Sequence, residues 1–223
     1  MKNILCLWSG GIDSTCMVLE YLRKGYHVDC CYVKLHNNVV KTRMELQAID
    51  FIYNDLQKIF ERKITKNQNT FDIDLHYTGD TKLKQFPIWL NCLINAIHIN
   101  HDMVAMGYIM NDDAISYLEE FKKVYYSYSF LFDNNIPEIE FPLSKVKKRE
   151  IFSAVPIEIA KKTVFCETPF EEEGEIYKPC GSCETCEKRR YYEKRGYIPN
   201  DLIVFGERWI EKGDVVELIK KES

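Results

Sequence analysis

The chain has 223 residues, a formal net charge of −4 at pH 7 and nine cysteines. Its length fits one large domain or one domain with a small addition, and no apolar run reaches the roughly 18 residues of a membrane span, so we expect no membrane association. The first residues lack the features of a signal peptide, which predicts a cytoplasmic protein with reduced thiols, and the odd cysteine count excludes a fully paired disulfide framework.

Short apolar runs alternate with segments of helical periodicity along most of the chain. A helix is expected after the first strand and should end at Gly25, because glycine commonly follows the last turn of a helix. Strands are predicted at residues 2–8, 27–35, 71–75, 102–107 and 138–143, and further helices at 42–60, 87–99, 113–130 and 147–162. This alternation predicts an α/β domain with a doubly wound parallel sheet.

The regular alternation stops after Cys166. An acidic segment follows at 171–175, then three further cysteines, and then a basic helix at 188–195. We therefore interpret residues 1–165 as the α/β domain, and residues 166–223 as a small C-terminal subdomain with a tail.

A candidate nucleotide loop joins the first strand to the first helix; it consists of Ser9, Gly10, Gly11, Ile12, Asp13, Ser14 and Thr15. Such a turn exposes free backbone N–H groups at the positive end of a helix dipole, which favours phosphate binding. Serine hydroxyls can donate to phosphate oxygens, and Asp13 can cap the helix or help to hold Mg²⁺. The alternative is an ordinary glycine-rich turn capped by Asp13 or Ser14. The loop matches neither G-x-x-x-x-G-K-[ST] nor G-x-G-x-x-G, which disfavours a dinucleotide-binding fold.

The second motif is a cysteine cluster. Cys180, Cys183 and Cys186 form C-x₂-C-x₂-C, and Cys166 lies upstream. Four thiolates suit a closed tetrahedral zinc site, while an iron–sulfur cluster, a redox-active pair and free structural thiols remain as alternatives. The other cysteines fall in apolar strand or helix positions and are interpreted as buried: Cys6, Cys16, Cys30, Cys31 and Cys92. Cys16, close behind the loop, is kept as a candidate persulfide carrier.

The loop resembles the pyrophosphate loop (PP-loop) of the N-type ATP pyrophosphatases. Together with the C-terminal cysteines it resembles the 7-cyano-7-deazaguanine synthase family. The resemblance implies an adenine nucleotide α-hydrolase-like fold, bound ATP, Zn²⁺ and Mg²⁺, and a homodimer. It also implies that the carboxylate of 7-carboxy-7-deazaguanine is adenylated and attacked by ammonia, giving an amide, and that a second activation then gives the nitrile.

The same resemblance suggests roles for individual residues. Asp13, Ser14 and Lys148 are the candidate catalytic groups, with Lys148 neutralising charge as pyrophosphate leaves; its alternative is a solvated basic face shared with Lys145 and Lys147. Substrate contacts are expected from Gly107, Asp112, Tyr117, Glu119, Lys84 and His36. An acidic group here can accept from guanine-like N–H donors, and Tyr117 can stack on the ring; the alternative is an exposed helix start.

The sequence departs from the family pattern at three places, which leaves the activation half of the chemistry intact and the substrate and acceptor half remodelled. Ile12 replaces the glutamine of S-G-G-Q-D-S, Lys84 stands near the missing G-R-N segment, and His36 lies where a tyrosine-glycine-glutamine stretch is lost. Three other functions therefore stay open. One is a defence-associated enzyme that transfers the activated deazaguanine to a protein amine. Another is a tRNA-thiolating enzyme, in which Cys16 or a cysteine of the cluster would carry sulfur and the basic helix would hold RNA, although the overall acidity argues against it. The third is a non-catalytic nucleotide sensor.

Overall fold

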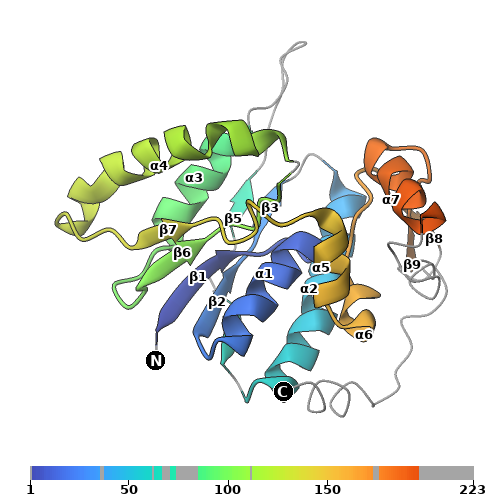
Figure 1. Cartoon of the computed structure of the whole chain (residues 1–223), viewed down its shortest axis with the longest axis horizontal. Helices are drawn as coiled ribbons and strands as arrows, with labels where there is room; N and C mark the ends of the chain where they lie inside the picture. Colours follow the sequence, from blue (N-terminus) through green and yellow to red (C-terminus); the bar gives the residue numbers. More distant parts are fainter. Residues whose placement is uncertain are drawn as a thin grey trace.

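The structure is a computed structural model that describes residues 2–35, 38–61, 63–66, 71–73, 85–110, 112–172 and 176–195. Its centre is a five-stranded sheet in the order β4-β2-β1-β6-β7, in which every pairing is parallel (Figure 1). The strands are β1 (Asn3–Leu7), β2 (His27–Cys31), β4 (Ile64–Lys66), β6 (Met103–Ala105) and β7 (Glu138–Glu140). The predicted α/β fold with a parallel sheet is confirmed.

Helices cover both faces of this sheet, as Figure 1 shows. One face packs on α1 (Ile12–Arg23), α2 (Val39–Ile59), α5 (Lys148–Ala154) and α6 (Ile157–Ala160), and the other on α3 (Gln85–Ala96) and α4 (Leu118–Ser127). Successive residues of β1 alternate between the two cores: Ile4 and Cys6 face one, and Leu5 faces the other. The period-2 alternation of strand side chains explains why such a strand is apolar throughout.

Several predicted boundaries were wrong. The strand expected at 27–35 is interrupted at Tyr32, and β3 (Val33–Leu35) leaves the main sheet to pair with β5 (Phe71–Ile73). β4 was not predicted, because three residues carry too little pattern to be recognised. The predicted strand at 71–75 is described only as far as Ile73.

Two predicted helices are broken. The segment at 113–130 contains a 3-10 turn (Asp113–Tyr117), then α4, then a second 3-10 turn (Tyr128–Phe132). The segment at 147–162 divides into α5 and α6 because proline disfavours a helical conformation in the residue before it, and Val155, which precedes Pro156, is extended. The predicted end of α1 is confirmed: Gly25 has φ +82° and its N–H donates to the carbonyl of Leu22.

The C-terminal part packs against α2 through a small apolar cluster. Its elements are an antiparallel hairpin, β8 (Phe170–Glu172) and β9 (Ile176–Lys178), and the helix α7 (Glu184–Lys194). Met44 and Ala48 of α2 are buried against Val164 and the cysteine-bearing segment. In the described part of the chain, no helix combines the length and apolar character needed to cross a bilayer.

Candidate functional site

The candidate nucleotide loop lies between the end of β1 and the start of α1, as predicted. Gly10 has φ +72°, and a Cβ at this position would lie 3.2 Å from the carbonyl oxygen of Glu45 on α2. Glycine is therefore required here both for the backbone conformation and for the close approach of α2. Gly11 precedes α1, and no side chain caps the helix end, so its N–H groups remain available for an anion.

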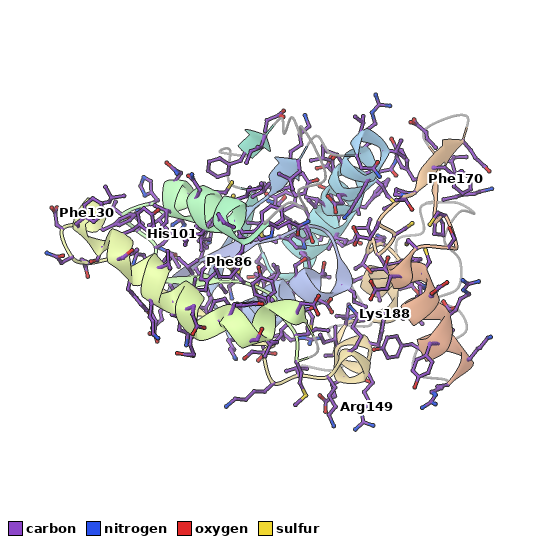
Figure 2. The ribbon with its side chains drawn as sticks, turned by 90° about the horizontal axis from the view of Figure 1, so that it is seen from above. Phe86, His101, Phe130, Arg149, Phe170 and Lys188 are labelled. Atoms are coloured by element: carbon purple, nitrogen blue, oxygen red, sulfur yellow. The ribbon has the colours of Figure 1, made fainter. Side chains whose placement is uncertain are left out.

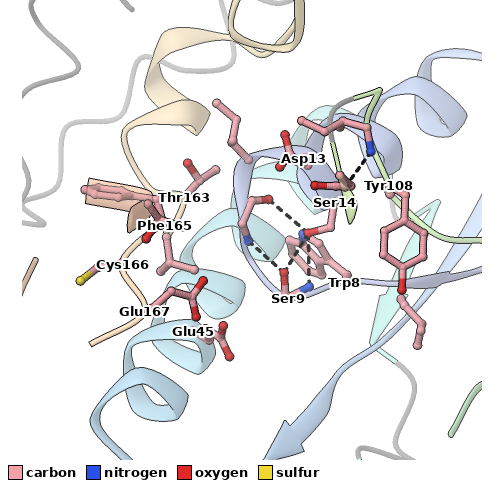
Figure 3. Close-up of a pocket in the computed structure, with 18 of the residues that line it drawn as sticks. Trp8, Ser9, Asp13, Ser14, Glu45, Tyr108, Thr163, Phe165, Cys166 and Glu167 are labelled. Atoms are coloured by element: carbon pink, nitrogen blue, oxygen red, sulfur yellow. Dashed lines mark hydrogen bonds between the residues drawn. The ribbon is translucent and has the colours of Figure 1, made fainter. Parts of the chain in front are cut away.

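The serine hydroxyls of this loop are held by one another. Ser9 Oγ and Ser14 Oγ are 3.2 Å apart, and Ser14 Oγ donates to the carbonyl of Gly11 over 3.2 Å (Figure 3). Thr15 points the other way: it is fully buried and its Oγ1 accepts a hydrogen bond from Trp8 Nε1 at 3.0 Å. The structure therefore places Thr15 as a support beneath the loop.

Lys148 reaches the loop from α5. Its Nζ lies 2.5 Å from Asp13 Oδ2, whereas Asp13 Oδ1 is buried without a hydrogen-bond partner among the described residues. Asp112 lies nearby, and burial raises the pKa of its carboxyl, with the Asp13 charge adding to the effect. An unpartnered carboxylate oxygen at the start of a helix fits a hard cation, so Asp13 can hold Mg²⁺.

These groups line one cavity of about 960 Å³. Of the predicted site residues, it brings together Ser9, Gly11, Ile12, Asp13, Ser14, Gly107, Asp112, Lys148 and Cys166. Gly107, just past β6, touches the loop so closely that a Cβ would lie 3.1 Å from Ser14 Cα.

Two predicted substrate contacts are not brought to the cavity. Tyr117 is 60% exposed, and Glu119 faces solvent with Lys122 as its ion-pair partner. His36 and Lys84 lie outside the described residues, so their predicted roles stay predictions.

The cavity also contains residues that sequence reasoning missed. Tyr108 lines the cavity, whereas Tyr117, the residue expected to stack on the substrate, does not. Burial raises the pKa of the Tyr108 hydroxyl to about 12. Its position directly after Gly107, at a strand end, was the available signal. Other polar residues of the cavity that sequence reasoning missed include Tyr32, Lys41, Glu45, Glu167, Thr185 and Glu187. They come from four distant segments, and no local pattern joins them.

The four predicted metal ligands do come together. The Sγ atom of Cys166 lies 3.6 Å from that of Cys180 and 3.9 Å from that of Cys183, and the Sγ atoms of Cys180 and Cys186 are 4.0 Å apart. Four sulfurs about 2.3 Å from one tetrahedral ion would lie roughly 3.8 Å apart, so the group fits a single metal ion.

Hydrogen bonds favour the thiolate form of two of these cysteines. The Thr168 hydroxyl and the backbone N–H groups of Ser182 and Cys183 donate to Cys180 Sγ and lower its pKa to about 5. Burial raises the pKa of Cys183. Hydrogen bonds from the Thr185 hydroxyl and from backbone N–H groups lower it by more, so that the net pKa is about 7. Metal ligation requires the deprotonated form.

The other five cysteines are buried, which confirms their interpretation. Burial raises the pKa of Cys16 to about 11, and that of Cys31, which lines the cavity, to about 12. Outside the four-cysteine group, the described part of the cavity therefore offers no thiol that ionises readily at neutral pH.

Helix α7 forms one wall of the cavity. Arg189 stacks on Phe165, with the guanidinium carbon 4.2 Å from the ring centre, and its Nε donates to Glu193 over 2.8 Å. Arg190 donates to the carbonyl of Gly181 over 2.7 Å, which ties α7 to the cysteine turn. Figure 2 shows Lys188 on this C-terminal element, at the other end of the molecule from Phe130. The turn that carries the cysteines is thus in direct contact with the helix that forms part of the cavity wall.

Comparison with known proteins places this loop in context. Residues 1–75 match the family model of the thiamine biosynthesis protein ThiI. The tRNA-specific 2-thiouridylase MnmA of Sulfurimonas denitrificans is 30% identical over 167 residues, which are 67% of this chain and 48% of that protein. The chain thus spans about half the length of this curated relative.

Two solved structures show weaker likeness. The U34-tRNA thiolase NcsA of Methanococcus maripaludis, solved with its [4Fe-4S] cluster, has a TM-score of 0.45 and 14% identity, and the match covers 88% of this chain and 67% of NcsA. A protein described as a predicted subunit of tRNA methyltransferase from Methanocaldococcus jannaschii has a TM-score of 0.38 and 13% identity, with coverage of 88% and 90%. These low scores carry no conclusion.

The two sequence matches support the resemblance to PP-loop proteins in general. The segment at 1–75 contains the loop, so the chain is similar to ATP-using PP-loop proteins in the region that would bind the nucleotide. The names of these relatives concern thiamine biosynthesis and tRNA thiolation, and they do not support the narrower likeness to 7-cyano-7-deazaguanine synthases.

Proposed function

We propose that the protein is an ATP-dependent enzyme that adenylates the carboxylate of 7-carboxy-7-deazaguanine, after which a nitrogen nucleophile displaces AMP. The observation that carries this proposal is the single cavity that joins the nucleotide loop to the cysteine-held wall, without a readily ionised free thiol among its described residues. Its volume is at the upper end of the range of ligand pockets, which suits a nucleotide together with a second small molecule.

The loop end of the cavity has the groups that adenylation needs. The N–H groups at the start of α1 and the paired hydroxyls of Ser9 and Ser14 suit phosphate oxygens, and Lys148 supplies a positive charge beside them. Mg²⁺, when bound at Asp13, would neutralise phosphate charge. The substrate carboxylate attacks the α-phosphate, pyrophosphate leaves, and positioning with charge stabilisation provides the acceleration.

Asp112 and Tyr108 support a purine-like substrate. A carboxylate accepts from the adjacent N–H donors of a guanine-like edge, and Asp112 is held by a 2.8 Å hydrogen bond from the Ile109 N–H. The Tyr108 ring lines the same part of the cavity and can stack on a heterocycle. These two residues take the roles that the sequence resemblance had assigned to Asp112 and Tyr117.

We propose zinc for the four-cysteine site. The Sγ separations of 3.6–4.0 Å suit one tetrahedral ion, whereas an iron–sulfur cluster places several atoms between its ligands and spreads them further apart. Metal analysis should give one zinc per chain. A visible absorption band with stoichiometric iron would contradict this assignment.

The test of the reaction is ATP–pyrophosphate exchange that depends on 7-carboxy-7-deazaguanine. We expect exchange only when both ATP and the carboxylate are present, and mass spectrometry of the products with ammonia should show the amide or the nitrile. Products that stop at the adenylate, even with ammonia, would favour a protein amine as the acceptor. A protein that shows no carboxylate-dependent exchange would refute the proposed function.

Thiolation of tRNA is a second candidate, favoured by the 30% identity to a 2-thiouridylase. It requires a sulfur donor at the activated base, and the raised pKa values of Cys16 and Cys31 do not favour either as a persulfide carrier. Copurified tRNA, together with ATP-dependent incorporation of labelled sulfur into it, would support this candidate. The loss of that activity in Cys16→Ser alone would identify the carrier.

A further inference from the structure

Helix α2 brings a half-buried carboxylate, that of Glu45, into the cavity beside the nucleotide loop. Glu45 lines the cavity, and its own backbone carbonyl is the group that approaches Gly10. Figure 3 shows Glu45 and Glu167 directed into the same part of the cavity, away from Asp13 and Ser14. The cavity therefore has an end suited to phosphate and a separate side that carries carboxylates.

The contacts of Glu45 hold its carboxylate in a defined orientation. Tyr32 Oη, at the end of the sheet, donates to Glu45 Oε2 over 2.6 Å. Lys41 lies one turn earlier on α2, with its Nζ 3.9 Å from Glu45 Oε1, and it also pairs with Glu167. Two carboxylates thus share one ammonium group, so these three side chains together carry a net negative charge.

The environment of Glu45 favours proton uptake. Burial raises its pKa, the Lys41 charge and the Tyr32 hydrogen bond act in the opposite direction, and the Glu167 charge raises it further, with a net shift upward. A carboxylate is a more effective general base when its pKa lies nearer to the working pH. A negatively charged wall is unfavourable for a triphosphate and favourable for a cationic amine.

We propose that Glu45 is the general base of the second half-reaction and deprotonates the nitrogen nucleophile, an ammonium ion or primary ammonium group, and that Tyr32 is the positioning residue that orients it. This inference rests on the proposed function. Glu45 takes one proton from the ammonium, and the freed lone pair forms the C–N bond to the carbonyl carbon of the acyl-adenylate. The C–O bond to AMP breaks, its electron pair stays on the phosphate oxygen, and the protonated amide nitrogen loses its extra proton to water. Glu45 then releases its proton to solvent.

The test separates the two half-reactions in Glu45→Gln, which keeps the shape of the side chain but is not a base. With 7-carboxy-7-deazaguanine and ATP, we expect pyrophosphate exchange to stay within about threefold of the wild type, and amide formation from ammonia to fall by roughly 100-fold at pH 7. Hydroxylamine, which is already unprotonated at neutral pH, should still give hydroxamate at a near wild-type rate. Glu120→Gln, at an exposed position on α4, is the matched control and should change none of the three rates.

The pH dependence gives a second readout. Wild-type amide formation should decrease as the pH falls through the pKa of Glu45, because the base becomes protonated. This decrease is the acidic limb of the pH–rate profile, and Glu45→Gln should lack this limb. Tyr32→Phe removes a hydrogen bond that lowers the Glu45 pKa, so the limb should move to higher pH while exchange is retained. Glu45→Asp should recover part of the amide formation that Glu45→Gln loses.

Three results would overturn the inference or its premise. If Glu45→Gln lowers exchange, hydroxamate and amide formation equally, Glu45 serves the nucleotide site or the fold. If it leaves amide formation unchanged, Glu45 is not the base. If the wild type itself shows no carboxylate-dependent exchange, the proposed function fails before the role of Glu45 is reached.

Discussion

The two ends of the cavity are built in opposite ways. The nucleotide loop is made of consecutive residues between β1 and α1, and hydrogen bonds between close neighbours such as Ser9 and Ser14 hold it on the main core of the sheet. The opposite wall comes from α7, whose position depends on four sulfurs and a small apolar cluster beside an exposed hairpin. We therefore expect the position of the loop to depend mainly on packing against the sheet, and the position of α7 to depend mainly on a bound metal ion.

The largest expected effect is at the loop end. Lys148→Ala removes the cation that contacts Asp13, and we expect carboxylate-dependent exchange to fall by about 100- to 1000-fold, because a preorganised charge at a transferring phosphate is lost. Lys145→Ala, at an exposed position of the same basic segment, is the control and should have little effect. Equal losses in both variants would indicate that Lys148 belongs to a solvated basic face.

Loss of a bound metal ion should weaken substrate binding at the α7 end of the cavity. Cys183→Ala removes one of the four ligands, and we expect loss of bound metal and a rise of at least about tenfold in the substrate KM, since α7 is no longer held against the cavity. Cys92→Ala, outside the cluster, should keep the metal. A KM that is unchanged in metal-free protein would show that the wall does not need the ion.

Two glycines with similar backbone conformations allow a direct comparison of the two regions. Gly10 and Gly181 have φ +72° and +73°, but a Cβ at Gly10 would meet Glu45 and Ile49 at 3.2 Å, whereas a Cβ at Gly181 would meet nothing within 4 Å. Gly181→Ala should cost only the conformational term of about 1–2 kcal/mol. Gly10→Ala should cost more and also displace the loop, which thermal unfolding and the KM for ATP would show. Similar losses would mean that the contact with α2 is easily relieved.

The smallest effect on nucleotide binding is expected beneath the loop. Thr15→Val removes the acceptor for the Trp8 indole N–H, and leaving that donor unpaired should lower the free energy of unfolding by about 1–3 kcal/mol. Because Thr15 lies outside the cavity, the KM for ATP should change little. Thr15→Ser keeps the hydroxyl and serves as the control. A large rise in KM with unchanged stability would instead place Thr15 in contact with the nucleotide.

The site could be predicted where its residues are neighbours in the chain. Ser9 to Ser14 could be recognised because strand, turn and helix follow one another, and the four cysteines because their spacing itself limits the geometry. Tyr117 does not line the cavity, because it lies in the 3-10 turn at the start of the segment predicted as one helix and is exposed there. Glu45 carries no local signal, since a charged residue in an amphipathic helix is usually solvated.

The sequence by itself determined the strand–loop–helix unit, the parallel α/β class and the grouping of the four cysteines, because each depends on local backbone preference, hydrophobic periodicity or short spacing. Only the tertiary structure decided that α2 brings Glu45 beside the loop, and that Tyr108 and residues of α7 line the cavity. These placements depend on how distant segments pack onto one sheet, and packing is a property of the whole core that no single segment encodes.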